Sequence, residues 1–203
     1  MKNRFFLIHD VFFLPFFKVF SVLLSIQLLF SLSLCNSECN SAAFRLLIGR
    51  VVNLASMYGR MGNMLRSPYC VTKYGVEAFS DCLRYEMKAW GVKVSVIEPG
   101  NFIVATGILT RDIVASTANK LWSEAPSAVK EDYGKAHFEQ YMALMRSYCN
   151  SGQKDLAPVL DDITDAIVSK RPYTRYNPME PHWWIRVQVM THLPGAISDL
   201  LYF

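Results

Sequence analysis

The order strand, helix, strand between Gly49 and Gly100 constrains the fold of this chain most strongly. The first segment, GRVVNLAS, is a short β-branched run with charge only at its start, as expected of a strand buried on both faces. Ser67 and Pro68 then begin a helix whose apolar residues recur at spacings of three and four until Gly91. The second strand, VKVSVIEPG, follows at once. Strands joined in this way run parallel, so the sequence predicts an α/β fold with a mostly parallel sheet.

The part of the chain after this unit is mainly helical in pattern. Residues 111–148 are charged and helix-prone, with Pro126 and Gly134 as breaks, and Pro158 begins another helix that runs to Ser169. Residues 171–203 are aromatic and interrupted by prolines. We expect this last segment to cap a pocket and not to form a second domain.

Residues 1–48 have a different character and form a separate hydrophobic segment. The apolar run at residues 5–34 ends in an uncharged stretch, Val19–Leu34, that is slightly shorter than the roughly 20 residues of a spanning helix. A signal peptide or signal anchor is one interpretation, and an N-terminal membrane helix is another. Translation of a polypyrimidine tract is a third, because the codons of Phe, Leu, Ser and Pro are mostly pyrimidine in their first two positions.

Charge and cysteine content argue against several kinds of partner. The formal net charge is +4, and no block of five or more Lys and Arg residues occurs, so we expect no nucleic-acid binding. The five cysteines are irregularly spaced and form no cluster with metal-ligand spacing. We therefore expect buried free thiols and no metal site.

Ser56, Tyr69 and Lys73 form a candidate catalytic set. Tyr69 and Lys73 are four residues apart on the predicted helix, so their side chains share one face about one turn apart. An ammonium beside a tyrosine favours the phenolate, so the pair makes a usable general acid and base. Ser56 ends the preceding strand, from which a loop can return it to the helix. Its hydroxyl can then donate to a substrate carbonyl oxygen.

The Tyr-x-x-x-Lys spacing, the strand-end serine, the Ser-Pro helix start and the segment Glu98-Pro99-Gly100 together resemble the short-chain dehydrogenase/reductase family. The segments DYGK, PYTRYNPM and MTHLPGAISDLLY extend the resemblance over residues 49–203. The resemblance implies a partial Rossmann-like sheet with flanking helices and NAD as cofactor. It also implies oxidation of a secondary alcohol, (R)-3-hydroxybutyrate, to the keto acid acetoacetate.

The resemblance also implies a role for individual residues. Tyr69 is the expected acid and base, Lys73 binds the nicotinamide ribose, and Ser56 orients the substrate. Pro99 and Gly100 are expected to lie against the nicotinamide.

Three further residues are candidates for binding roles. The family often has a cofactor-contacting threonine five positions after the proline, where this chain has Val104, so the nearby Thr106 is the expected contact. Arg60 and Arg66 flank the loop between the serine and the tyrosine and could bind a substrate carboxylate, the alternative being that they are solvated.

The resemblance further implies a homo-oligomer, a phospholipid partner and a place at the mitochondrial inner membrane or matrix. The hydrophobic segment could instead direct the chain to the endoplasmic reticulum membrane. The first glycine in the sequence is Gly49, so no Gly-rich phosphate-binding turn precedes it. We therefore expect a truncated enzyme that binds NAD weakly or not at all. The alternative is a membrane-inserted, non-catalytic chain that associates with full-length subunits.

Overall fold

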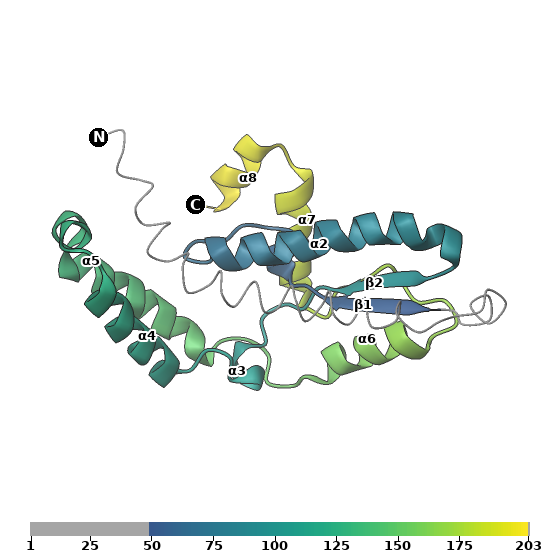
Figure 1. Ribbon diagram of the computed structural model, residues 1–203, viewed down its shortest axis with the longest axis horizontal. Coiled ribbons are helices and arrows are strands. Elements are labelled where there is room, and N and C mark those ends of the chain that lie inside the picture. The colour runs from purple at the N-terminus through teal and green to yellow at the C-terminus, as the bar shows by residue number, and fades with distance from the viewer. Residues whose placement is uncertain (1–48, 203) are drawn as a thin grey trace, which may run out of the picture. The chain divides into compact units, whose positions relative to one another are not determined.

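The computed structural model describes residues 49–202, which form two compact units (Figure 1). One unit contains residues 49–100 and 156–202, and the other contains residues 101–155. None of the helices in residues 49–202 has the length and apolar content needed to cross a bilayer. The predicted N-terminal hydrophobic helix and the targeting segment lie outside the described residues.

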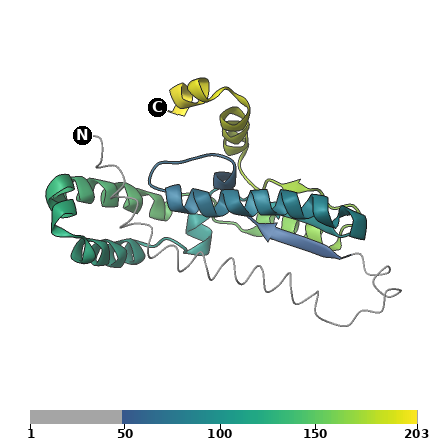
Figure 2. The same cartoon turned by 45° about the horizontal axis from the view of Figure 1, so that its top comes forward.

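The first unit is built on a three-stranded parallel sheet. Its strands are β1 (Arg50–Leu54), β2 (Lys93–Ile97) and β3 (Arg175–Tyr176), in the spatial order β1-β2-β3. Helix α2 (Ser67–Met87) packs on one face of β1 and β2, and helix α6 (Ala157–Val168) packs on the opposite face (Figures 1 and 2). The predicted α/β class with a parallel sheet and flanking helices is confirmed.

The two predicted strands differ in how deeply they are buried. Strand β2 lies in the middle of the sheet, and Val96 and Ile97 are fully buried there. In β1, by contrast, Leu54 is 47% exposed and only Asn53 is buried. The expectation that the first strand is buried on both faces was therefore wrong. The reason is its position, because within the described residues β1 pairs with β2 alone.

Helix α2 begins and ends where its sequence signals place it. Pro68 occupies its first turn, and a short 3₁₀ turn, Lys88–Trp90, continues it. Gly91 then adopts a left-handed conformation with φ of 71° and donates its backbone N–H to the Lys88 carbonyl. A glycine takes this conformation without a steric penalty, which explains the stop at Gly91.

Strand β3 was missed by the sequence reading, which treated its segment only as part of a cap. It has only two residues, too few for an alternating pattern to be visible. Its attachment is nevertheless specific: Glu98 donates its backbone N–H to the Tyr176 carbonyl at 2.8 Å. Two helices follow it, α7 (Pro181–His192) and α8 (Gly195–Tyr202).

The second unit is helical, as predicted. It contains α3 (Ile103–Thr106), α4 (Arg111–Glu124), α5 (Ser127–Ser147) and a short 3₁₀ turn (Tyr148–Asn150). Both predicted breaks are confirmed, since Pro126 separates α4 from α5, and Gly134 has φ of 71° and ψ of 154° within α5.

Three cysteines of the described residues are free. Cys70 and Cys149 are buried, whereas Cys82 is exposed on α2, so the expectation of buried thiols was wrong for this one.

Gly59 allows α2 to approach the 3₁₀ turn η1 (Met57–Gly59) closely. A Cβ atom at Gly59 would lie 2.9 Å from Glu77 Cγ and 3.0 Å from the Lys73 carbonyl oxygen. We expect Gly59→Ala to displace α2 and to lower the free energy of unfolding by about 1–3 kcal/mol in urea denaturation. Gly62→Ala is the matched control, because a Cβ there meets no atom within 4 Å. Equal midpoints for the two variants would contradict this packing.

Candidate active site

The candidate site lies at the carboxyl ends of β1 and β2. Pairing between the two chain segments continues past the strands. Ala55 donates its N–H to the Ile97 carbonyl at 2.8 Å, and Met57 donates to the Pro99 carbonyl at 3.0 Å. Ser56 is thereby fixed beside the segment that follows β2, as parallel strands that end at the same edge require.

Ser56 is buried and begins the turn η1. Its Oγ accepts a hydrogen bond from the Tyr58 backbone N–H at 3.2 Å, and only 5% of the residue is exposed. The ring of Tyr58 meets the ring of Tyr69 edge to face, with centroids 6.4 Å apart. The serine and the tyrosine of the candidate set are therefore connected through Tyr58.

Tyr69 and Lys73 lie in the first turns of α2, and the structure brings them together. Lys73 Nζ is 5.7 Å from the centroid of the Tyr69 ring, and it donates a hydrogen bond to the Leu54 carbonyl at 3.0 Å. Burial lowers the pKa of Lys73, and the charge of Glu77 partly opposes this. Their arrangement is the one expected from the spacing, while their catalytic role stays a prediction.

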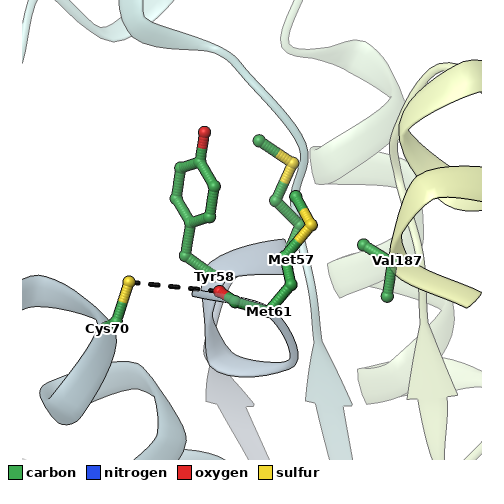
Figure 3. Close-up of a cluster of buried hydrophobic side chains, with 5 residues drawn as sticks. All are labelled: Met57, Tyr58, Met61, Cys70 and Val187. Carbon is green, nitrogen blue, oxygen red and sulfur yellow. Dashed lines mark hydrogen bonds between the residues drawn. The ribbon is translucent and has the colours of Figure 1, made fainter. Parts of the chain in front are cut away.

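A cluster of buried, mainly apolar side chains packs against Tyr69. Figure 3 shows its buried members: Met57, Tyr58, Met61, Cys70 and Val187. Four partly buried residues pack against them, namely Tyr69, Met179, Trp183 and Met190. Helix α7 thus packs against the same cluster as Tyr69, while the expectation that the C-terminal segment caps a pocket stays a prediction.

Hydrogen bonds that the sequence did not predict join α8 to the loop between η1 and α2. The Tyr202 hydroxyl donates to Asn63 Oδ1 at 2.5 Å and accepts from the Met64 N–H at 2.9 Å. Asn63 in turn donates to the Tyr58 hydroxyl at 2.9 Å. Helix α8 is therefore bonded to the loop that follows η1, and Asn63 of that loop is bonded to Tyr58 in η1.

Both candidate arginines of the loop have partners in the structure. Arg60 donates to the buried Glu98 carboxylate at 3.4 Å. The Arg66 guanidinium lies 5.4 Å from the centroid of the Tyr58 ring. Binding of a substrate carboxylate by either arginine stays a prediction.

The expected cofactor contacts lie in both units. Gly100 donates its N–H to the Pro178 carbonyl at 3.1 Å, and a Cβ at Gly100 would lie 2.7 Å from the Cβ of Met179. Glycine is thus needed for the close approach of two backbone segments beside the site. Thr106 belongs to the other unit, where its hydroxyl donates to the Phe102 carbonyl at 3.0 Å. Its contact with a cofactor stays a prediction.

A partly buried charge cluster next to the site was also missed. The Arg175 guanidinium donates to the carboxylate of Glu77, to Glu98 at 2.5 Å and to Asp81 at 2.7 and 2.8 Å. Asn177 donates to the second oxygen of Glu98 at 2.8 Å. One arginine therefore joins α2 to the ends of β2 and β3.

The Glu77 carboxyl group has a perturbed pKa. Burial raises its pKa to about 7, the charge of Glu98 acts in the same direction, and the hydrogen bond from Arg175 opposes both. The charge of Glu77 consequently changes near neutral pH.

Comparison with known proteins identifies this arrangement. Residues 36–112 match the family model for short chain dehydrogenases. Mitochondrial D-beta-hydroxybutyrate dehydrogenase from Rattus norvegicus is 58% identical over 154 residues, which are 76% of this chain and 45% of that protein. The matched part of the chain belongs to the short-chain dehydrogenase family.

Two further relatives are similar over the same extent. The Bos taurus D-beta-hydroxybutyrate dehydrogenase is 57% identical over 155 residues, covering 76% of this chain and 45% of that protein. Retinol dehydrogenase 7 of Rattus norvegicus is 41% identical over 155 residues, covering 76% and 48%. The chain thus spans slightly less than half the length of the curated relatives it matches.

Among solved structures, a short-chain dehydrogenase from Streptomyces avermitilis aligns with a TM-score of 0.46 and 20% identity. The alignment covers 75% of this chain and 49% of that one.

The ionisation of Glu77 predicts a pH-dependent stability for this short-chain dehydrogenase segment. The pKa is raised from the ordinary 4.5 to about 7, so the folded state holds this proton more tightly than the unfolded chain. The stabilisation is therefore complete below pH 4.5 and is lost as the pH rises to about 7. We expect the parent to lose on the order of 3 kcal/mol more stability than Glu77→Gln over this range.

Urea denaturation at a series of pH values measures this difference. The control is Glu86→Gln, which alters an exposed glutamate of the same helix and should follow the parent. Parallel stability curves for the parent and Glu77→Gln would contradict the assigned ionisation.

Proposed function

We propose that the chain is part of an NAD-dependent short-chain dehydrogenase that interconverts (R)-3-hydroxybutyrate and acetoacetate. The 58% identity to the rat D-beta-hydroxybutyrate dehydrogenase is the observation that carries this proposal. The side chains near Tyr69 support it, because they combine a proton-transfer group with an apolar, partly buried surrounding.

Mitochondrial localisation belongs to the same proposal, since the names of three similar relatives include it. Contact with a phospholipid is part of it too.

In this proposal Tyr69 is the acid and base of the reaction. During alcohol oxidation its oxygen takes the proton of the substrate hydroxyl, and during ketone reduction it returns that proton to the carbonyl oxygen. The Lys73 ammonium, 5.7 Å from the ring centroid, stabilises the phenolate form between these events. The Ser56 hydroxyl donates a hydrogen bond to the substrate oxygen and holds it against Tyr69.

The polar groups near Tyr69 suit a nicotinamide nucleotide, which accepts or delivers the hydride at the substrate carbon. An ammonium has three N–H donors, and within the described residues Lys73 uses one of them, on the Leu54 carbonyl. The remaining donors are suited to ribose hydroxyls. Pro99 and Gly100 supply backbone at the strand end for the same cofactor in this proposal.

Replacement of Tyr69 by phenylalanine tests this proposal directly. We expect Tyr69→Phe to lower kcat for acetoacetate reduction by about 10²–10⁴-fold, because it removes the proton donor and leaves the ring in place. The measurement is NADH consumption by the purified full chain. Tyr74→Phe is the matched control, since Tyr74 lies on the same helix and is 44% exposed. Turnover by Tyr69→Phe at the rate of the control would overturn the assigned role.

A second function is favoured by the apolar surface of α2. Four large apolar residues of this helix are more than a third exposed: Val71, Tyr74, Phe79 and Tyr85. A surface of this kind suits burial against another protein chain. The corresponding proposal is a non-catalytic chain that associates with full-length subunits of a short-chain dehydrogenase, as in a mixed oligomer.

Turnover distinguishes the two proposals. A full chain that consumes NADH with acetoacetate, and loses this activity in Tyr69→Phe, supports the enzyme. A chain without turnover that co-purifies with a full-length short-chain dehydrogenase subunit supports the second function. Loss of that co-purification in Tyr85→Lys, at an exposed position of α2, would attribute it to this surface.

A further inference from the structure

Helix α2 carries a buried acid that the proposed reaction does not use. Glu77 follows Lys73 by four residues, so the two side chains share one face of the helix one turn apart. Glu77 is only 5% exposed, and one of its carboxylate oxygens, Oε1, accepts no hydrogen bond from the described residues. A buried carboxylate without full hydrogen bonding is costly and therefore calls for an explanation.

Charged groups face Glu77 from each element that packs on it. Arg175 on β3 donates to its Oε2, Glu98 after β2 shares that same arginine, and Arg60 after η1 pairs with Glu98. On its own helix, Lys73 lies one turn before it and Asp81 one turn after it. Arg175 thus forms the ion pair with Glu77. Lys73 is the cation that lies between Glu77 and Tyr69 along α2.

The surroundings of Lys73 make it dependent on this acid. Its Nζ donates to the Leu54 carbonyl, and burial disfavours its charged form. The charge of Glu77 acts in the opposite direction and favours the ammonium. Gly59 permits the Glu77 side chain and the backbone of α2 at Lys73 to lie close to η1, since a Cβ there would lie 2.9 Å from Glu77 Cγ and 3.0 Å from the Lys73 carbonyl oxygen.

We propose that Glu77 is a positioning residue whose carboxylate, held by Arg175, maintains Lys73 as an ammonium beside Tyr69. The consequence for catalysis rests on the function proposed above. The pKa of Glu77, about 7, means that its negative charge develops as the pH rises through neutrality. A lysine with a lowered pKa also loses its proton as the pH rises. The negative charge of Glu77, which favours the Lys73 ammonium, therefore grows over the same pH change that removes the proton.

The reactivity of Lys73 toward acetic anhydride tests the proposal without any need for turnover. The full chain is pulse-labelled at a series of pH values, and mass spectrometry gives the acetylation of Lys73 relative to the exposed Lys88. We expect Glu77→Gln to label Lys73 several-fold faster at neutral and alkaline pH, with the midpoint moved to lower pH. Glu77→Asp keeps the charge and should retain a midpoint above that of the glutamine variant.

Glu86→Gln is the matched control and should reproduce the parent, since Glu86 is exposed on the same helix. Faster labelling of Glu77→Gln at every pH with an unchanged midpoint would indicate a purely structural role and overturn the proposal. An aspartate variant that behaves as the glutamine variant would also overturn it.

The parent protein alone provides a second test if Glu77→Gln does not fold. As Glu77 ionises, the labelling of Lys73 should rise less steeply with pH through about 7 than the labelling of Lys88. Equal slopes for the two lysines would overturn the proposal. A chain that shows the expected labelling but no dehydrogenase turnover would contradict the proposed function and leave this inference intact.

Discussion

The hydrogen bonds of Arg175 are the interaction on which the sheet unit depends. A single guanidinium contacts carboxylates on α2 and at the end of β2, while its own backbone forms β3. Glu98 is 1% exposed and Glu77 is 5% exposed, so neither carboxylate is stabilised by water. Ionised acids at such positions need a hydrogen-bonded cation, and a planar guanidinium can serve several of them at once.

The position of this cluster determines the geometry of the candidate site. One side of α2 carries four polar residues at intervals of four: Tyr69, Lys73, Glu77 and Asp81. The bonds from Arg175 to Glu77 and Asp81 therefore also fix the positions of Tyr69 and Lys73 on the helix. At the other end, Lys73 is bonded to the Leu54 carbonyl at the end of β1. The helix is therefore attached to two strands, and the close contact at Gly59 leaves it little freedom to shift. Pre-positioned side chains of this kind are what acid and base catalysis requires.

Much of this unit follows from the sequence, because hydrophobic periodicity reports local structure. The strand-helix-strand pattern, the stop at Gly91 and the meeting of Tyr69 with Lys73 were all predictable in this way. The two-residue strand β3 was not, since its role comes from partners 77 to 98 residues away in the chain. The exposure of Leu54 likewise depends on which strands flank β1, which no local pattern reports.

One signal in the sequence could have indicated the charge cluster. Glu77 and Asp81 continue the four-residue interval of Tyr69 and Lys73, so polar residues occupy a stripe that faces the sheet. Acids on a buried stripe require a cation, but the sequence alone does not say that it comes from Arg175.

The measurement that tests this account most directly is the stability of Arg175→Met in urea denaturation. Loss of the guanidinium leaves buried Glu77 without its cation and Glu98 with Arg60 alone, and we expect a fall in unfolding free energy of about 3–5 kcal/mol. Because Glu77 is one of those carboxylates, adding Glu77→Gln should recover part of the loss. An Arg175→Met protein that unfolds at the same urea concentration as the parent would contradict the central role of this arginine.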